Sequence, residues 1–160
     1  MELDPSAPYR DGVTEGNGRR PAIVVSACLL GVRCNHMGGS NRSPAVVEMG
    51  ATHWLVPVCP EVAGGLPTPR PAAELQPDGR VVTADGRDVT DAYRRGAEAT
   101  VALAAAAGAT EAVLKARSPS CGCREVYDGT FSRALVEGEG VTARALRAAG
   151  VRVRSEEEIP

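Results

Sequence analysis

The stretch Pro21-Ala-Ile-Val-Val-Ser-Ala-Cys28 decides the fold class, because it joins a short apolar run to a cysteine. The run, Ala22–Ala27, has the length and the β-branched content of a buried strand. Two later runs of the same kind also lead to a cysteine, namely Trp54–Val58 and Ala112–Lys115. The sequence therefore predicts three buried strands, each followed by a thiol.

Helical segments separate these runs. Ser43 is a typical N-cap and Pro44 suits the first helical position, which predicts a short helix over residues 43–49. An alanine-rich stretch predicts the longest helix over Thr90–Ala107, ending at Gly108. The other expected elements are a small hairpin over Glu74–Thr83, a helix over Thr142–Ala149, a strand over Val151–Arg154 and a short acidic helix or a frayed end after it.

Two segments are expected to form loops. Residues 60–70, Pro-Glu-Val-Ala-Gly-Gly-Leu-Pro-Thr-Pro-Arg, contain three prolines and two adjacent glycines, which argues against a regular element. A second loop is expected over Tyr127–Ser132.

Strands that alternate with helices in this way form a parallel sheet covered on both faces. We therefore expect an α/β fold, a Rossmann-like three-layer domain with a mostly parallel sheet. Residues 1–20 contain scattered Pro and Gly and little hydrophobic periodicity, so we expect them to form a flexible N-terminal tail. Residues 21–160 then make one domain of ordinary size.

The charge and hydropathy of the chain argue against nucleic-acid and membrane partners. The formal net charge is -2, and no cluster of Lys or Arg is interleaved with aromatic residues, so we expect no nucleic-acid partner. No segment approaches the roughly 20 apolar residues that span a bilayer, and the N-terminus lacks the apolar core of a signal peptide. We therefore expect a cytoplasmic protein with no membrane partner, and the oligomeric state stays open.

The five cysteines of such a chain favour metal binding or catalysis over a disulfide framework. The carboxyl ends of parallel strands meet at one edge of a sheet, where ligands bind. Cys28, Cys59 and Cys121 would meet at this edge, and three thiolates suit a soft metal or an iron–sulfur cluster. Cys34 and Cys123 are either spectators or the source of a fourth ligand.

Other cofactors and nucleophiles are less well supported by the spacing. Structural zinc usually takes paired Cys-x-x-Cys ligands, whereas here Cys121 and Cys123 alone are close in sequence. His36 and His53 stand apart from these cysteines, so no Cys–His nucleophile pair is indicated and both are expected at the surface or in packing. The first strand is not followed by Gly-x-Gly-x-x-Gly, which argues against a nicotinamide dinucleotide.

Polar residues near the cysteines are candidates for proton transfer and substrate contacts. Glu61, just after the second strand, stands in the constrained loop, where desolvation would favour acid–base use. The hydroxyls of Ser118 and Ser120 could each donate to a substrate or cap the following turn. Arg70 and Lys115 could orient a polar substrate, although solvation or an ion pair is the commoner role.

Four longer motifs contain most of these residues: Ser26-Ala-Cys-Leu-Leu-Gly31, Val58-Cys-Pro-Glu-Val-Ala-Gly-Gly-Leu-Pro-Thr-Pro-Arg70, Lys115-Ala-Arg-Ser-Pro-Ser-Cys-Gly122 and Tyr127-Asp-Gly-Thr-Phe-Ser132. Together, and in this order, they resemble the small, single-domain thiouracil desulfidase family, formerly a domain of unknown function. The resemblance covers residues 22–158. Where many members of that family have Arg-Tyr-Asp-Gly, this chain has Asn35-His-Met-Gly38.

The resemblance implies an iron–sulfur enzyme. It implies a 4Fe-4S cluster bound by Cys28, Cys59 and Cys121, with one iron that the protein does not bind. It further implies non-redox desulfuration of a thiolated pyrimidine base, 2-thiouracil or a similar one, to uracil and sulfide. In this reaction Glu61 would activate water or relay its proton, and Ser118 would position the base or assist proton transfer. The alternative is a non-catalytic iron–sulfur or zinc-binding module with a sensor or structural role.

Overall fold

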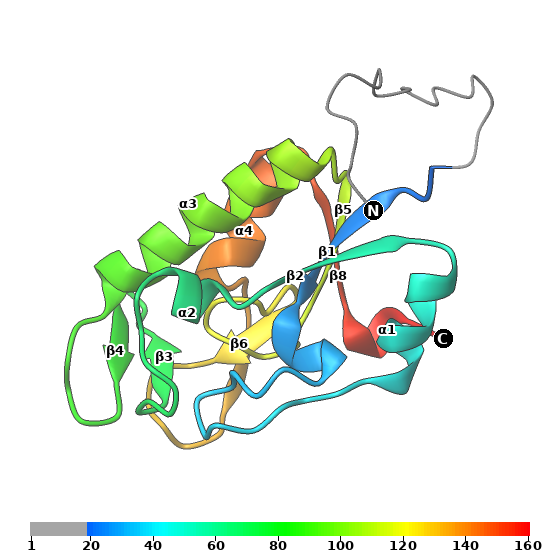
Figure 1. Cartoon of the computed structure of the whole chain (residues 1–160). Coiled ribbons are helices and arrows are strands. Elements are labelled where there is room, and N and C mark those ends of the chain that lie inside the picture. Colours follow the sequence, from blue (N-terminus) through cyan, green and yellow to red (C-terminus); the bar gives the residue numbers. More distant parts are fainter. Residues whose placement is uncertain (1–18) are drawn as a thin grey trace, which may run out of the picture.

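The structure, a computed structural model, describes residues 19–160 and contains a central parallel sheet (Figure 1). The sheet consists of β1 (Ala22–Ser26), β2 (Trp54–Val58), β5 (Glu111–Leu114) and β8 (Arg152–Ser155). Their spatial order is β2-β1-β5-β8, so β1 lies between β2 and β5. The three strands expected before the cysteines are confirmed, each within one residue of its expected ends.

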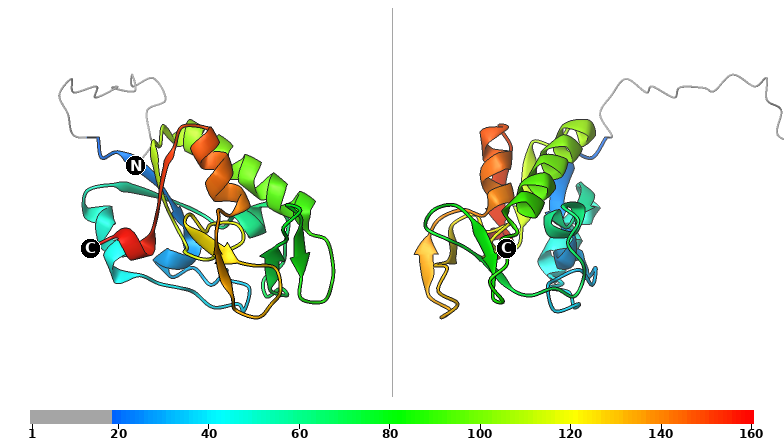
Figure 2. Two further views of the ribbon diagram at one scale, coloured as in Figure 1. Left: turned by 180° about the vertical axis from the view of Figure 1, so that it is seen from behind. Right: turned by 90° about the vertical axis from the view of Figure 1, so that its left-hand side faces the viewer.

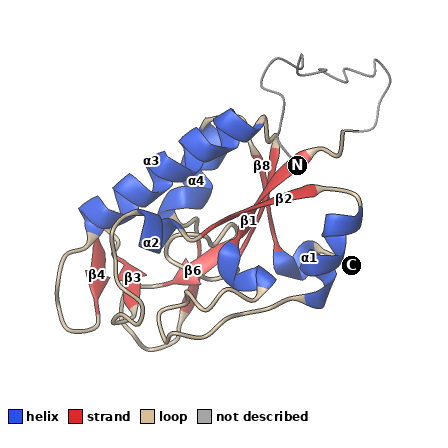
Figure 3. Ribbon diagram, viewed as in Figure 1, coloured by secondary structure: helices blue, strands red, loops and turns tan. Residues whose placement is uncertain are grey.

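Helices cover both faces of this sheet (Figure 3). Figure 2 shows α3 and α4 side by side on one face, while α1 and η1 pack on the other. The helices are α1 (Pro44–Glu48), α2 (Pro60–Ala63), α3 (Thr90–Ala107) and α4 (Val141–Ala148), and the 3-10 turns are η1 (Ala27–Leu30), η2 (Met49–Ala51) and η3 (Glu156–Glu158). The three-layer α/β architecture expected from the sequence is confirmed.

The central strand β1 supplies side chains to both hydrophobic layers. Val24 faces the layer that contains Leu146 of α4, whereas Ile23 and Val25 face the layer that contains Val46 of α1. Successive side chains of a strand point to opposite faces, so a continuous apolar run is needed when both faces are covered. This explains why β1 has no polar alternation.

The expected helix boundaries are largely confirmed. Ser43 caps α1, with its Oγ accepting from the backbone N of Val46 at 3.4 Å. The longest helix has the predicted bounds and ends at Gly108 in the left-handed conformation. Helix α4 begins and ends one residue earlier than expected, and β8 begins and ends one residue later. The acidic helix expected at the C-terminus is η3.

The prediction of no regular element over residues 60–70 is confirmed for residues 64–70 but wrong for residues 60–63. Pro60 begins the one-turn helix α2, and Gly64 ends it. Proline breaks the interior of a helix but is favoured in its first turn, where its missing N–H has no intrahelical partner. Cys59 is therefore a helix N-cap rather than a residue before a loop, and Glu61 lies in the first helical turn.

Two antiparallel hairpins lie outside the central sheet. The first, β3 (Ala73–Leu75) with β4 (Val81–Thr83), is the hairpin expected there. The second, β6 (Glu125–Tyr127) with β7 (Leu135–Glu137), was not predicted, and its connection contains most of the expected loop Tyr127–Ser132. All three residues of β7 are exposed, so the sequence carries no alternation that would indicate a strand.

The expected N-terminal tail, residues 1–20, lies almost wholly outside the described residues, so the division of the chain into a tail and one domain stays a prediction. Within residues 19–160, no helix combines the length and the apolar character that crossing a bilayer requires.

Candidate active site

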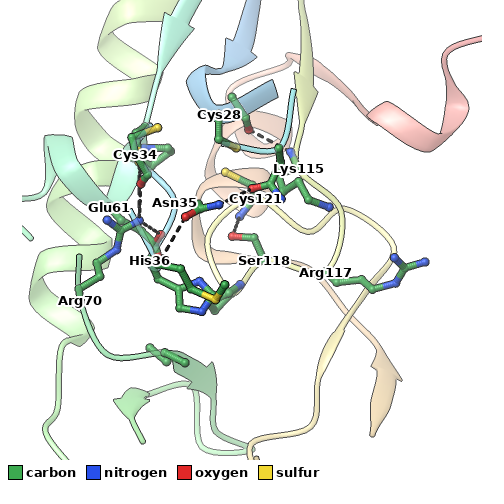
Figure 4. A pocket seen from close by; sticks show the side chains of 18 of the residues that line it. Cys28, Cys34, Asn35, His36, Glu61, Arg70, Lys115, Arg117, Ser118 and Cys121 are labelled. Atoms are coloured by element: carbon green, nitrogen blue, oxygen red, sulfur yellow. Dashed lines mark hydrogen bonds and ion pairs between the residues drawn. The ribbon is translucent and has the colours of Figure 1, made fainter. Parts of the chain in front are cut away.

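A cavity of about 580 Å³ opens beyond the carboxyl ends of β1, β2 and β5. This volume lies within the range of roughly 300–1,000 Å³ that is typical of small-molecule sites. Figure 4 shows side chains that line it, and four of the lining residues are Cys28, Cys34, Cys59 and Cys121. Because β1 lies between β2 and β5, cysteines that follow these strands reach one crevice.

Backbone hydrogen bonds hold the segments that carry Cys28 and Cys59. Cys28 lies in η1, and its carbonyl oxygen accepts from the backbone N of Asn41 at 2.9 Å. The carbonyl oxygen of Cys59 accepts from the backbone N of Ala63, also at 2.9 Å, in the turn of α2. The Sγ of Cys59 donates to the carbonyl oxygen of Cys34 at 3.7 Å, so these two cysteine-bearing segments are in contact.

The loop that carries Cys121 is anchored on the first turn of α4. The backbone N of Val141 donates to the carbonyl oxygen of Pro119 at 3.0 Å, and that of Thr142 donates to the carbonyl oxygen of Ser120 at 2.9 Å. The hydroxyls of Ser120 and Thr142 are hydrogen-bonded at 2.8 Å. These contacts hold the buried Cys121 at the wall of the cavity.

Burial is the main cause of the raised pKa values of Cys28, Cys34 and Cys121. Burial, together with the neighbouring Cys59, raises the pKa of Cys28 to about 11. Burial likewise raises the pKa of Cys121 to about 12, and burial together with Cys59 and Cys28 raises that of Cys34 to about 12. Without a cation Cys28, Cys34 and Cys121 are therefore protonated at neutral pH, and a metal that binds such thiols as thiolates would release protons.

The thiols line one cavity but do not converge on one point. Among residues 19–160, no three His, Cys, Asp or Glu side chains are placed so that they could hold one metal ion. A single zinc ion needs its ligands around one centre, whereas in a 4Fe-4S cluster each thiolate binds a different iron. The arrangement of the thiols thus fits a cluster better than one zinc ion.

The structure separates the two cysteines whose role the sequence left open. Cys34 lines the cavity together with the three strand-end cysteines. Cys123 lines a different cavity, and its Sγ donates to Oε2 of Glu158 at 3.8 Å. A contribution of Cys123 to the first cavity is therefore not supported by its position.

Glu61 reaches the cavity from α2 and is held on both carboxylate oxygens. Nη2 of Arg70 donates to Oε2 at 2.6 Å, and the hydroxyl of Tyr93 on α3 donates to Oε1. The Glu61 side chain is 16% exposed and that of Arg70 is 4% exposed, so this ion pair is largely shielded from water. The carboxylate therefore has one fixed orientation at the wall of the cavity (Figure 4).

Tyr93 and the detailed role of Arg70 were missed by the sequence analysis. Tyr93 stands in a helix where an aromatic residue is usually a core residue, and it lies 32 positions from Glu61. The expectation that Arg70 forms an ion pair is confirmed.

Ser118 caps the turn before Cys121. Its Oγ accepts from the backbone N of Ser120 at 3.1 Å and from that of Cys121 at 3.0 Å, so its own proton is free to be donated. Ser120 is buried and its hydroxyl bonds to Thr142, away from the lining of the cavity. Of the two serines, Ser118 is thus the one that both caps the turn and lines the cavity.

Lys115 and the two histidines take ordinary structural positions. The Nζ of Lys115 pairs with Oε1 of Glu156 at 2.6 Å, as expected for the commoner role. His53 is hydrogen-bonded to Thr52 at 2.8 Å, and His36 is exposed. His36 nevertheless lines the cavity, because it lies two residues after Cys34.

The loop between β6 and β7 forms another wall of the cavity. Oε1 of the buried Glu74 accepts from the backbone N of Gly129 at 3.0 Å and from that of Phe131 at 3.1 Å. Phe131 and Arg133 have positive φ angles of 57° and 65°, which non-glycine residues rarely adopt. Both residues and Tyr127 line the cavity, so Glu74 holds a strained loop at its wall.

Comparisons with known proteins agree with the resemblance seen in the motifs. The model of the family described as 2-thiouracil desulfurase matches residues 23–158. "Uncharacterized protein YbbK" of Bacillus subtilis (strain 168) is 41% identical over 146 residues, which cover 86% of this chain and 97% of that protein. A solved structure named 4Fe-4S-dependent thiouracil desulfidase TudS (DUF523Vcz) is 46% identical, with a TM-score of 0.82, over 88% of this chain and 93% of its own.

The family match spans most of the chain, and the same fold is found in a solved structure at high identity. The family predicted from the motifs is therefore confirmed, as is the prediction that the protein is an enzyme. The chain belongs to the 2-thiouracil desulfurase family.

Proposed function

We propose that this enzyme removes sulfur from a thiolated pyrimidine base with the help of a 4Fe-4S cluster. Cys28, Cys59 and Cys121 would bind three of the irons, and the fourth iron would have no protein ligand. The observation that carries the proposal is that these three thiols, from three different strand ends, line one cavity with Glu61 and Ser118. Membership of the family and the similarity to TudS, a 4Fe-4S-dependent thiouracil desulfidase, support the same reaction and the same cofactor.

The donor set suits this cofactor. Thiolates are soft ligands that select iron–sulfur clusters, and the three cysteines belong to separate segments, which lets each reach a different iron. When bound, the cluster would supply a soft Lewis acid for the thiocarbonyl sulfur at its open iron. All five cysteines are free, and a cytoplasmic location, where thiols stay reduced, is part of the proposal.

Glu61 would accept a proton from the water that replaces the sulfur. Its carboxylate lines the cavity, and Arg70 and Tyr93 hold both of its oxygens, so its orientation would not change between turnovers. In the reaction, the oxygen of water replaces the sulfur of the C=S group, and the sulfur leaves as hydrogen sulfide with the two protons of the water. Atoms therefore balance without any oxidant or reductant. A positioned general base typically contributes a factor of about 100 to 10,000 in rate.

Ser118 would donate its hydroxyl proton to a ring heteroatom of the base. Two backbone N–H groups occupy lone pairs of its Oγ, which leaves the O–H to point toward another acceptor. Tyr127 and Phe131, which also line the cavity, would offer apolar surface to the flat pyrimidine ring. The substrate would therefore be bound by one polar and one apolar wall.

The non-catalytic alternative has less support. A sensor or structural module would not need a carboxylate held on both oxygens beside the thiols, and the matched family consists of desulfurases by its description. A zinc module is further disfavoured because, among residues 19–160, no three His, Cys, Asp or Glu side chains are placed to hold one metal ion.

The proposal is tested by anaerobic reconstitution of the full chain, followed by iron and sulfide counts and by the conversion of 2-thiouracil or 4-thiouracil to uracil. We expect about four irons per chain. Cys28→Ser, Cys59→Ser and Cys121→Ser should each lose the cluster. Glu61→Gln and Ser118→Ala should keep it, with Glu61→Gln slower by about 100- to 10,000-fold.

The exposed Glu48→Gln on α1 serves as the control and should match the parent in iron content and rate. A parent protein that holds four irons but converts neither thiouracil would overturn the proposed substrate class. Full iron content in any of the three cysteine variants would overturn the ligand assignment.

A further inference from the structure

Arg70 is a buried cation at the junction of three segments that form the cavity. Its side chain is 4% exposed, and a buried charge is stable only when it is paired and hydrogen-bonded. Its Nη1 donates to the carbonyl oxygen of Pro67 at 3.2 Å and to Oγ1 of Thr68 at 3.1 Å, within its own loop. The second terminal nitrogen, Nη2, contacts groups from elsewhere in the chain.

Three groups of the proposed site surround Nη2. It lies 2.6 Å from Oε2 of Glu61, 2.9 Å from the carbonyl oxygen of Cys34 and 3.9 Å from Sγ of Cys59. One nitrogen thus bridges the proposed general base, a proposed cluster ligand and the η1–α1 loop. Figure 4 shows the guanidinium directed at Glu61 and at the backbone of Cys34.

These contacts orient the guanidinium in a way that leaves its third nitrogen, Nε, without a hydrogen bond within residues 19–160. Its Nε is buried and has no hydrogen-bond partner among the described residues. A buried donor without a hydrogen-bond partner is unfavourable, so this orientation needs a compensating interaction. Nη2 and its three contacts are the group that can provide one.

We propose that Arg70 is a positioning residue that fixes the Glu61 carboxylate relative to the Cys59 sulfur. The inference rests on the proposed function and deepens it, because it says what keeps the base and the cofactor at one spacing. An N–H donor beside a ligating sulfur also stabilises its thiolate form when the cofactor is bound. Arg70 would therefore act on cluster retention and on turnover together.

Lysine can replace arginine only in part at this position. An ammonium group could pair with Glu61, but it lacks the planar fork that reaches the Pro67 side and the Cys59 side at once. Glutamine could donate to Glu61 and carries no charge. The three variants Arg70→Lys, Arg70→Gln and Arg70→Met therefore separate charge, hydrogen bonding and packing.

The experiment reconstitutes each variant anaerobically as the full chain and measures three quantities: iron per chain, the rate of iron loss to a chelator, and kcat and KM for a thiouracil. Replacing such an outer partner of a metal ligand typically costs 10- to 100-fold in affinity or activity. We expect Arg70→Met to lose iron about 10-fold faster and to lower kcat about 10- to 100-fold, with KM within about twofold. Arg70→Lys should recover part of both effects, and Arg70→Gln less.

Arg80→Met is the matched control, because Arg80 forms an exposed ion pair with Asp78 on the β3–β4 hairpin, away from the cavity. It should match the parent in all three quantities. Thermal unfolding of each variant reports whether it is folded.

Tyr93→Phe tests the hydrogen bond to the other carboxylate oxygen of Glu61 while Arg70 stays unchanged. We expect this variant to lower kcat while it keeps the parent rate of iron loss, since Tyr93 contacts Glu61 and not Cys59.

Two results would overturn the inference. The first is an Arg70→Met protein that keeps both the parent rate of iron loss and the parent kcat. The second is a rise in KM at unchanged kcat, which would make Arg70 a substrate-binding group. Failure of the proposed function is distinct, because it would appear as a parent protein with full iron and no turnover, and the rate of iron loss would still test Arg70.

Discussion

Gly64 at the end of α2 and Gly96 in α3 bring the backbones of the two helices into direct contact. A Cβ at Gly64 would lie 1.9 Å from the carbonyl oxygen of Ala92, and a Cβ at Gly96 would lie 1.9 Å from that of Pro60. This close approach brings Tyr93 of α3 within hydrogen-bond reach of Glu61. The placement of Glu61, the proposed general base, thus depends on having glycine, which has no side chain, at positions 64 and 96.

Gly96→Ala is expected to disturb the site although it lies outside the cavity. Alanine normally favours a helix over glycine by about 1 kcal/mol, but here the overlap with the backbone of α2 should cost about 1–3 kcal/mol in the free energy of unfolding. Denaturant unfolding measures this loss. Because α2 must move, kcat should fall as well.

Ala105→Gly, at an exposed position of the same helix, separates the two effects. It should lower the free energy of unfolding by about 1 kcal/mol and leave kcat unchanged. A Gly96→Ala protein with parent activity would show that the α2–α3 contact does not position Glu61.

Cys34→Ser tests whether the proposed cluster has an open iron. Cys34 lines the cavity beside Cys28 and Cys59, so its thiol is the one thiol that the described lining offers besides the three proposed ligands. We expect Cys34→Ser to keep the iron content of the parent, because three cysteines suffice for the proposed site. Iron and sulfide counts after anaerobic reconstitution check this.

Cys123→Ser is the companion variant, because Cys123 lies at a different cavity and donates to Glu158. It should also keep its iron. Loss of the cluster in Cys34→Ser alone would mean a closed, four-cysteine site and would contradict the proposed reaction at an open iron.

Glu74→Ala is expected to loosen the loop between β6 and β7. Glu74 accepts two backbone N–H bonds from this loop, and such bonds to a charged group contribute about 1.5–3 kcal/mol each. The amides of Gly129 and Phe131 should exchange with deuterium faster, and KM should rise several-fold because Phe131 lines the cavity. Hydrogen exchange and steady-state kinetics measure the two effects.

Asp78→Ala, on the turn of the β3–β4 hairpin, is the control because, within residues 19–160, the hydrogen bonds and the ion pair of its side chain are all to Arg80. Its exchange pattern at Gly129 and Phe131 should match the parent. Unchanged protection in Glu74→Ala would contradict the proposed anchoring.

The carboxyl group of Glu158 is expected to contribute to the pH dependence of the free energy of unfolding. The backbone N–H of Ser155 donates to its carboxylate at 2.7 Å and, with the nearby Arg124, holds the pKa of Glu158 below its usual value. A carboxyl whose pKa is lower in the folded state stabilises the fold above its unfolded pKa, about 4.3, and this contribution is lost as the pH falls through the folded value.

We therefore expect the free energy of unfolding of the parent to fall more steeply on acidification from about pH 5 than that of Glu158→Gln. Urea unfolding at a series of pH values measures the difference. Parallel curves for the two proteins would show that Glu158 does not contribute.

Part of the candidate site could be predicted from local sequence. Each of the three cysteines follows a short apolar run, and such runs predict strands whatever the rest of the chain does. The parallel alternation then predicts that their carboxyl ends meet, as β1, β2 and β5 do. The four motifs, taken together and in their order, predicted the family.

Other features were not predictable from local patterns. Helix α2 was not predicted because proline breaks a helix in its interior but is favoured in its first turn, where Pro60 lies. Cys34 and Cys123 looked equivalent in the sequence, and the direction of their loops alone separates them. Strand β7 was missed because its residues are exposed and carry no periodicity.

The sequence by itself determined the strands of the central sheet, the long helix, the thiols that follow three of these strands and the family, because these depend on neighbouring residues and on motif order. Tertiary structure alone decided that Tyr93 and Arg70 hold the two oxygens of Glu61. Those partners lie 32 and 9 positions from Glu61 and meet through the packing of α2 on α3 and through the loop that follows α2. No local propensity encodes such a contact, since it depends on how closely two backbones approach in the folded chain.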